Sequence, residues 1–275
     1  MKEKSINSFK IYMCLTLAVL FAFGFSGCLF GGPKLTHPRD YYGEREVGDF
    51  LVYFFSDDTC VVKGTTEQGN SKRFLIIPQQ IEDSPVDTFG NKLIMNITAP
   101  LIESDVLEKV FVESDEIRFW NYSSELDCPT FKKIICLKEC AHNKTIGDIV
   151  VYFPRYICER YSLENPNTIP LNAANVSYYY NYEDAENYGY YWADDCDYGG
   201  KIEFIPEEPV REGYEFGGWY KEAECINEWD FEVDTLPEEV TEPNQTIVND
   251  EIILTEKVVY QETILYAKWI NAVKG

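Results

Sequence analysis

Short apolar stretches separated by turn residues dominate the chain from Asp49 to about residue 158. Each stretch has the length of a β-strand, and none is long enough for a typical helix. The pattern therefore predicts a β-rich region. The stretches are Phe50–Phe55, Phe74–Ile77, Leu93–Ile97, Val110–Val112, Ile134–Leu137 and Ile149–Phe153.

Two segments of this region are near copies of one another. Leu107–Val112 reads Leu-Glu-Lys-Val-Phe-Val and Phe131–Cys136 reads Phe-Lys-Lys-Ile-Ile-Cys, so that equivalent positions lie 24 residues apart. This spacing is typical of solenoids, in which each repeat contributes one short strand. Because fewer than three units cannot bury a continuous core, we expect about four or five coils over residues 49–158.

The segment Phe74–Gly90 reads Phe-Leu-Ile-Ile-Pro-Gln-Gln-Ile-Glu-Asp-Ser-Pro-Val-Asp-Thr-Phe-Gly. It resembles a unit of the leucine-rich repeats of the bacterial surface antigen (BspA-like) type, which carry a short parallel strand and often an Ile-x-Ile-Pro step. Ser84 stands where such units usually have a glycine, and the later units lose the regular spacing between strands. The resemblance implies a short, degenerate leucine-rich-repeat-like solenoid of parallel strands over residues 49–158.

A second module follows a linker at residues 159–174, which contains Pro166 and Pro170. Residues 176–182 alternate in the period of two that a half-buried strand shows. Farther on, glycines at turn-like spacing lie among the large aromatic residues Tyr214, Phe216 and Trp219. The pattern predicts a small β module with an aromatic core, which folds by itself because the Pro-rich linker lets few contacts cross.

The phrases Gly-Tyr-x-Phe-x-Gly-Trp-Tyr at residues 213–220 and Leu-Tyr-Ala-Lys-Trp at residues 265–269 resemble the Listeria-Bacteroides repeat, also called the internalin B-repeat. The resemblance covers residues 175–270 and implies a β-grasp-like fold found on extracellular proteins of bacteria. An acidic insertion between Leu236 and Glu262 departs from the family pattern. Within it, Ile252–Leu254 and Val258–Tyr260 are candidates for additional strand residues.

The aromatic residues of this module have two interpretations. Trp219 and Trp269 are expected in the core, with a ligand-binding role as the alternative, because large rings dominate the cores of small domains. A second group of rings offers rigid, amphipathic contact area for a partner. Ordinary strand packing remains an equal alternative for that group. Its members are Tyr179, Tyr188, Tyr190 and Tyr191.

The first 27 residues have the pattern of a secretory signal, with Lys2, Lys4 and Lys10 ahead of an uncharged run from Ile11 to Phe25. The following Ser26-Gly27-Cys28 resembles a lipobox, which implies cleavage before Cys28 and lipidation of its thiol. Phe25 departs from the usual aliphatic residue at that step. An uncleaved membrane anchor is the alternative, since no charge interrupts Ile11 to Pro33. Residues 28–48 would then form a tether, with the rest of the chain outside the cytoplasmic membrane.

Composition narrows the set of partners. Removing residues 1–27 takes away three lysines and one glutamate, so the formal charge of −23 becomes −25. So acidic a chain is not expected to bind nucleic acid or anionic headgroups through charge. With 45% hydrophobic and 15% aromatic residues, it can bury one or two cores.

Seven cysteines remain after Cys14 and Cys28 are set aside. Cys128, Cys136 and Cys140, with His142 nearby, lack the paired spacing of a zinc site. We expect the cysteines to be small buried hydrophobic residues, with one disulfide among them as the alternative.

No catalytic set emerges from the remaining residues. His37 falls in the tether and His142 in a polar turn, while Asp194-Asp195-Cys196-Asp197 reads as a solvated turn without the alternation of a calcium loop. Nucleotide-binding, metalloprotease and serine-hydrolase motifs are absent from the sequence. We therefore expect no enzyme activity, no cofactor and no metal.

Together, these patterns predict a mainly β protein in which a short parallel-strand solenoid precedes a β-grasp-like module. The expected function is that of a lipid-anchored cell-surface protein with a binding or adhesion surface for a protein or glycan ligand. The alternatives are a passive structural protein of the cell envelope and an enzyme of unrecognised type that acts on envelope polymers.

Overall fold

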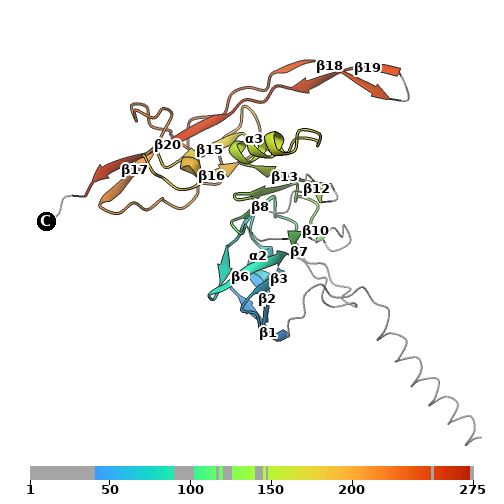
Figure 1. Cartoon of the computed structure of the whole chain (residues 1–275), viewed down its shortest axis with the longest axis vertical. Helices are drawn as coiled ribbons and strands as arrows, with labels where there is room; N and C mark the ends of the chain where they lie inside the picture. The colour runs from blue at the N-terminus through green and yellow to red at the C-terminus, as the bar shows by residue number, and fades with distance from the viewer. Residues whose placement is uncertain are drawn as a thin grey trace, which may run out of the picture. The chain divides into compact units, whose positions relative to one another are not determined.

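The computed structural model describes residues 41–89, 102–115, 118–119, 126–139, 145–146, 148–248 and 251–272. These residues are mainly β (Figure 1). The strand Leu93–Ile97 predicted from the sequence lies outside the described residues, as do Cys28, His37, Cys140 and His142.

The described chain opens with an antiparallel meander of β1 (Tyr41–Val47), β2 (Phe50–Phe55) and β3 (Cys60–Thr65). A two-residue turn joins β1 to β2, and Gly48 has a φ of 57° there, in the left-handed region that a glycine adopts without strain. β3 then pairs in parallel with β6 (Ser84–Phe89). The expectation that parallel coils begin at Asp49 is therefore wrong for β1–β3, because tight turns join neighbouring strands antiparallel. Short elements complete this region, namely α2 (Glu67–Asn70), β5 (Gln80–Ile81) and β9 (Arg118–Phe119).

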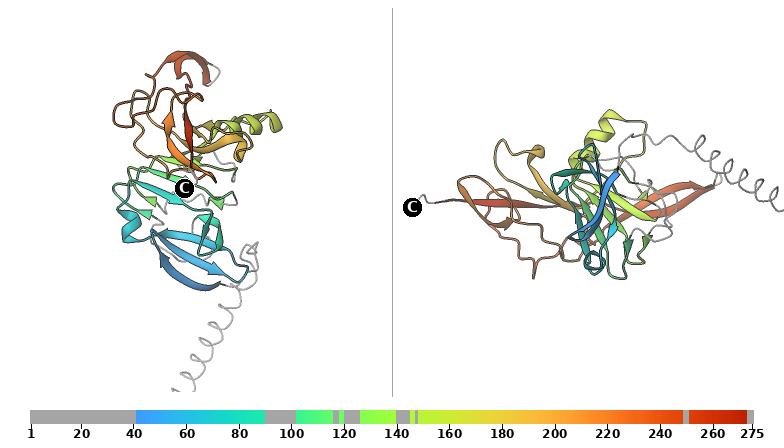
Figure 2. Two further views of the ribbon diagram at one scale, coloured as in Figure 1. Left: turned by 90° about the vertical axis from the view of Figure 1, so that its left-hand side faces the viewer. Right: turned by 90° about the horizontal axis from the view of Figure 1, so that it is seen from below.

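A parallel ladder follows, formed by β4 (Phe74–Ile77), β8 (Lys109–Val112), β11 (Lys133–Cys136) and β13 (Ile149–Phe153). Lys133 pairs with Lys109 and Cys136 with Val112, so the two near-identical segments stack in register as their 24-residue spacing predicts. Figure 2 shows the strands of this ladder from two further directions. Minor strands flank it, namely β7 (Ile102–Glu103), β10 (Leu126–Asp127), β12 (Thr145–Ile146) and β14 (Asn172–Ala173).

Both faces of the ladder are buried. Val110 and Ile134 point into a core that they share with β2 and β3, whereas Phe111 and Ile135 point into a second core that they share with the C-terminal module. This alternation follows from the period of two along a strand. The strands are therefore apolar on both sides, apart from Lys109 and Lys133.

Helix α3 (Arg155–Glu164) begins directly after Pro154 and was not expected from the sequence. It covers the end of the predicted repeat region and the first part of the predicted linker at residues 159–174. Two ion pairs, Arg155–Glu159 and Arg160–Glu164, span one turn each and support a short helix. Ile157 and Cys158 attach it to the ladder core.

The C-terminal module is a mixed sheet with the order β16-β15-β20-β17. β15 (Val176–Tyr179) and β20 (Thr263–Asn271) run parallel at its centre, and β16 (Tyr190–Asp194) and β17 (Tyr214–Tyr220) flank them antiparallel. Trp219 is buried beneath this sheet, as predicted. Trp269 is partly buried and donates its indole N–H to the Tyr180 carbonyl.

Within the acidic insertion, β18 (Thr241–Val248) and β19 (Glu251–Val258) form a separate hairpin. In Figure 1 this hairpin extends away from the four-stranded sheet. Val259 and Tyr260, which the sequence also proposed as strand residues, follow the end of β19, whereas Ile252–Leu254 and Val258 do lie in the strand. Their side chains are exposed.

Candidate binding site

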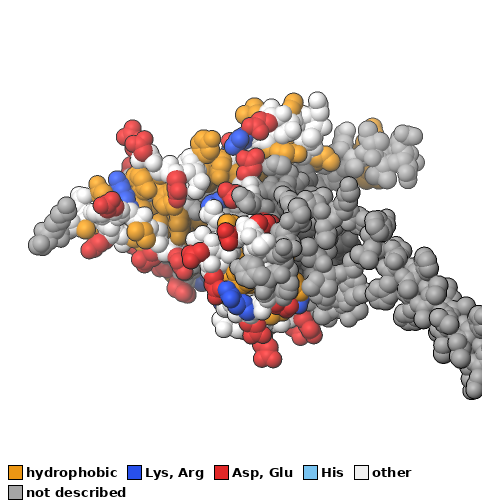
Figure 3. Space-filling model, turned by 60° about the horizontal axis from the view of Figure 1, so that its bottom comes forward, with side chains coloured by type: hydrophobic (Ala, Val, Ile, Leu, Met, Phe, Trp, Pro, Cys, Tyr) orange, Lys and Arg blue, Asp and Glu red, His pale blue; other side chains and the backbone are white. Residues whose placement is uncertain are grey.

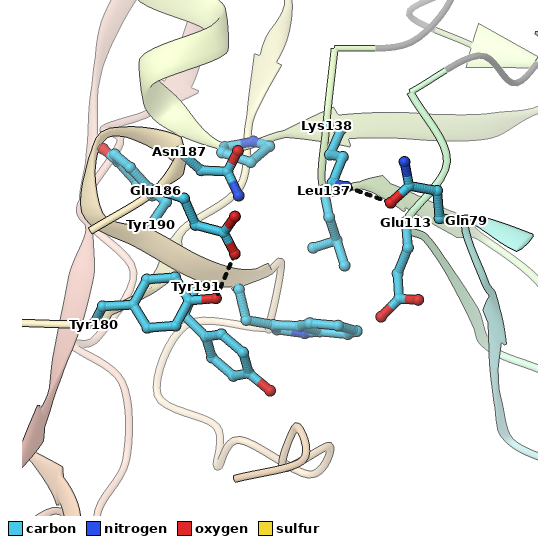
Figure 4. A pocket seen from close by; sticks show the side chains of 11 residues that line it. Gln79, Glu113, Leu137, Lys138, Tyr180, Glu186, Asn187, Tyr190 and Tyr191 are labelled. Atoms are coloured by element: carbon cyan, nitrogen blue, oxygen red, sulfur yellow. Dashed lines mark hydrogen bonds between the residues drawn. The ribbon is translucent and has the colours of Figure 1, made fainter. Parts of the chain in front are cut away.

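A cavity of about 240 Å³ lies where the ladder strands end and the β15–β16 connection passes over them (Figure 4). One wall comes from the ladder and the other from the C-terminal module. Its lining residues are Gln79, Glu113, Leu137, Lys138, Pro154, Tyr180, Glu186, Asn187, Tyr190, Tyr191 and Trp192.

The repeat geometry builds the ladder wall. Glu113, Leu137 and Pro154 are the residues that directly follow β8, β11 and β13. Because the strands are parallel and in register, these positions meet at one edge of the sheet. The backbone ladder continues there, since the Glu113 N–H donates to the Ile77 carbonyl at 2.9 Å and the Leu137 N–H to the Val112 carbonyl at 2.8 Å.

A β-bulge builds the aromatic wall. Tyr178 pairs with Trp192 and Tyr179 pairs with Tyr190, so Tyr191 is an extra residue on β16. Bulges re-aim side chains at the edges of sheets. Here the Tyr191 ring stacks on Trp219 with centroids 5.8 Å apart, and Tyr180 meets Tyr191 edge to face at 5.1 Å.

Several polar groups of the cavity are already bonded within the protein. The Tyr180 hydroxyl donates to Glu186 Oε1 at 3.1 Å, Lys138 Nζ donates to Gln79 Oε1 at 2.9 Å, and the Tyr191 hydroxyl donates to the Glu207 carbonyl at 2.7 Å. Figure 4 shows the first two of these bonds on opposite sides of the cavity.

Glu113 is different. Among the described residues, no hydrogen bond or ion pair reaches its half-buried carboxylate. Burial raises the pKa of Glu113 above its ordinary value; Lys138 opposes that rise, and Glu207 adds to it. The site thus holds a carboxylate that has lost part of its hydration without gaining a hydrogen bond or an ion pair from the described residues.

Buried ion pairs fix the two walls against each other. Lys109 Nζ lies 2.6 Å from Asp194 Oδ1, and the Asp194 side chain is 0% exposed. Lys133, one repeat further, lies 2.9 Å from the mostly buried Asp195 and 3.1 Å from Asp197, whose side chain is exposed. Burial raises the pKa of Asp194, and Lys109 opposes that rise. The prediction that residues 194–197 form a solvated turn is therefore wrong for Asp194 and Asp195, because the repeated lysines of the ladder draw them into the interior.

Aromatic contacts close the same interface. The Phe111 ring lies 4.4 Å from Phe204 and 5.2 Å from Trp192, measured between centroids. The expectation that few contacts cross the boundary before residue 175 is wrong, because Phe111 and Ile135 on one face of the ladder are part of the module's core.

A row of tyrosines continues from the cavity across the sheet. Centroid distances between neighbouring rings are 5.4 Å from Tyr188 to Tyr156, 4.7 Å from Tyr156 to Tyr190, 4.3 Å from Tyr190 to Tyr179 and 5.7 Å from Tyr179 to Tyr266. We call these five residues the tyrosine row. Tyr179 and Tyr190 are half-buried and so contribute to packing as well as to the surface.

Tyr188 stands at the exposed end of the row, in the short helical turn η2 (Asn187–Gly189). It is 76% exposed, and its φ of 58° lies in the left-handed region that is unfavourable for a bulky side chain. Such strain persists where the surrounding structure holds it and is frequent at functional sites. Tyr188 is therefore the strongest surface candidate among the predicted tyrosines.

Other residues that the sequence analysis singled out do not line this site. The expectation that the cysteines are buried is confirmed for Cys60, Cys136, Cys158 and Cys196, whereas Cys128 and Cys225 are only partly buried. Within the described ranges, no three His, Cys, Asp or Glu side chains gather as a metal site would require. Neither Glu113 nor Gln79 was predicted from the sequence as a site residue. The one available signal was the repeat itself, which places Glu113 and Leu137 at equivalent positions after their strands.

The described chain thus combines a parallel ladder, a mixed-sheet module and an aromatic cavity between them. Residues 175–242 match the Listeria-Bacteroides repeat domain, a repeat that is typical of bacterial surface proteins. The match ends where β18 begins, and the last strand of the module, β20, comes only after the inserted hairpin.

Comparisons with curated proteins and with solved structures return no match for this chain. In the described ranges, none of the helices combines the length and the apolar character that a membrane crossing requires.

Proposed function

We propose that this chain is a lipid-anchored cell-surface protein that presents a non-catalytic binding or adhesion surface. The observation that supports it most directly is the cavity with its unpartnered Glu113 carboxylate, continued by the tyrosine row to the exposed, strained Tyr188. Aromatic rings with a few oriented polar groups are typical of recognition sites. The surface repeat at residues 175–242 supports a position outside the cell.

The finer description of the fold is part of this proposal. The ladder corresponds to a short, degenerate leucine-rich-repeat-like solenoid, supported by the in-register pairing of segments 24 residues apart. The module corresponds to a β-grasp-like sheet, supported by the parallel central pair β15 and β20 with antiparallel neighbours.

Anchoring rests on Cys28, which lies outside the described residues. The basic residues before the apolar run and the Ser26-Gly27-Cys28 sequence support lipidation there. Cells that produce the Cys28→Ala variant should take up no fatty-acid label on this protein. A variant that keeps both the label and the mature size would contradict lipid anchoring.

The binding surface is tested by capture from arrays of matrix proteins and glycans. We expect Tyr188→Asn to reduce capture, because it removes an exposed ring. We also expect it to leave the free energy of unfolding unchanged or about 1 kcal/mol higher, because asparagine tolerates a positive φ. The control variant is Ile226→Ser, which changes another exposed apolar side chain. A tyrosine control at Tyr260 is unsuitable because the Tyr260 hydroxyl donates to the Ala174 carbonyl. If wild-type protein captures nothing, the chain is a passive structural protein.

A further inference from the structure

The Glu113 carboxylate lies in a cavity lined by both aromatic and polar side chains, and among the described residues no counter-charge is bonded to it. On the basis of the proposed function, we infer that this cavity binds a lysine side chain from a basic protein partner. The lysine ammonium would form an ion pair with Glu113, and its methylene stem would lie along the rings of the β16 wall.

Charge within the cavity favours a cation. The lining holds two carboxylates, Glu113 and Glu186, and one ammonium, Lys138. Lys138 donates to Gln79 and makes no ion pair with Glu113 within the described part of the chain, although its charge partly offsets the rise in the pKa of Glu113. An incoming ammonium would restore the electrostatic stabilisation that burial has taken from this carboxylate.

The remaining walls suit a lysine stem. Leu137 and the rings of Tyr180 and Tyr191 present apolar surface beside the carboxylate. Lysine packs its methylene chain on such surfaces while its ammonium reaches a polar partner, and nearby aromatic faces attract the cation. A cavity of about 240 Å³ is large enough for one side chain of this size.

A saccharide fits less well. Sugar recognition needs several donors and acceptors around a ring of hydroxyls. In this cavity the hydroxyls of Tyr180 and Tyr191 and the Gln79 carbonyl oxygen are engaged in bonds within the protein. The hydrogens of these two hydroxyls are therefore not available to a sugar.

The charge of the whole chain also favours a basic partner. Its formal charge of −23 attracts basic partners over distances of about one Debye length, which is ~8 Å at physiological salt. Figure 3 shows acidic side chains spread over the visible face with few basic ones between them. A basic protein would be steered towards such a surface.

The test is a ligand-observed NMR titration of the full-length chain in a non-ionic detergent. The probes are Nα-acetyl-lysine methylamide, its uncharged analogue Nα-acetyl-norleucine methylamide, and N-acetylglucosamine. We expect the lysine probe to bind about tenfold more tightly than either neutral probe, because a charge-assisted bond to a carboxylate contributes that much.

Three variants sharpen the test. Glu113→Gln should weaken lysine binding about tenfold. Glu215→Gln, which makes the same change at an exposed position on β17 outside the cavity, should leave binding unchanged. Lys138→Met removes the nearest competing cation and should strengthen binding.

Equal binding of the lysine and norleucine probes, or an unchanged affinity in Glu113→Gln, would overturn the inference. Preferential binding of the saccharide would also overturn it, in favour of a glycan site. Capture on arrays that depends on Tyr188 but not on Glu113 would leave the proposed function intact and reject only the lysine site. Lysine binding without any captured partner would retain the site and reject adhesion.

Discussion

Glu113 and Tyr188 both occupy positions that cost stability. Glu113 is a desolvated carboxylate without a partner among the described residues, and Tyr188 is a bulky residue with a φ of 58°. Packing alone gives no reason for either choice, because a smaller or uncharged residue would fit with less strain. Binding sites commonly sacrifice stability in this way for function. Both residues therefore lie on the surface that we propose for binding.

The Glu113→Gln variant should be at least as stable as the wild type at neutral pH. Burial raises the pKa of Glu113, so the folded wild type binds a proton at a higher pH than the unfolded chain does. As the pH rises from the ordinary glutamate value of 4.5 through the raised pKa, the wild type loses stability relative to the variant. Below 4.5 this difference disappears.

Urea unfolding of both proteins across this pH range measures the effect. A variant that is clearly less stable than the wild type at neutral pH would mean that Glu113 has a stabilising partner in solution, and the unpartnered carboxylate would be refuted.

At the scale of elements, apolar runs and their spacing were sufficient to predict the ladder strands. The runs at residues 110–112 and 134–137 became β8 and β11, and their 24-residue offset became their register. The sequence alone could not show that the side chains of Lys109 and Lys133 are shielded from water by another segment of the chain. Lysine in a strand usually faces water, and only the approach of Asp194 and Asp195 from a distant segment reverses this.

Helix α3 and Glu113 were missed for related physical reasons. The helix has only Ile157 and Cys158 as buried residues, so its periodicity is too weak to distinguish it from a turn. Glu113 is one acidic residue among many. Its loss of hydration depends on the β15–β16 connection, which lies more than sixty residues further along the chain.

The inserted hairpin β18–β19 should be dispensable for folding. Among the described strands, β18 and β19 pair with each other and with no other strand, and the Val259 N–H donates to the Val240 carbonyl at 2.8 Å at the base of the hairpin. A two-residue turn is closed by a hydrogen bond of this kind between the residues on either side of it. Residues 241–258 can therefore be replaced by Asn-Gly, with Val240 and Val259 on either side of the new turn.

Thermal melting of the shortened chain should match that of the wild type, and binding of the lysine probe should be unchanged. A shortened chain that fails to fold would show that the hairpin supports the closing strand β20, contrary to its isolated pairing.

At the scale of the whole molecule, the ladder and the C-terminal module share one core. Phe111 and Ile135 from the ladder are fully buried together with Trp192 and Trp219. Separating the two parts would expose these rings and leave Asp194 without Lys109, and a broken buried pair costs about 3–5 kcal/mol. A boundary drawn at residue 175 thus marks a change of sequence family and not a change of folding unit.

The full chain should therefore unfold in one cooperative transition, followed by both Trp fluorescence and far-ultraviolet circular dichroism. Residues 175–270 produced alone should lack a cooperative transition. Lys109→Ala should lower the melting temperature of the whole chain, while the exposed-residue variant Glu215→Gln should not. Two separate transitions in the full chain would show that the shared core is not a single unit.

The most direct test of the proposed recognition surface is amide hydrogen exchange of the full-length chain with and without a captured protein partner. The proposed site predicts slower exchange at two distant segments together, namely the strand ends around residues 113–115 and 137–139 and the β15–β16 connection at residues 180–192. Protection confined to other parts of the chain, such as the hairpin β18–β19, would contradict the assignment of the binding surface to the cavity and the tyrosine row.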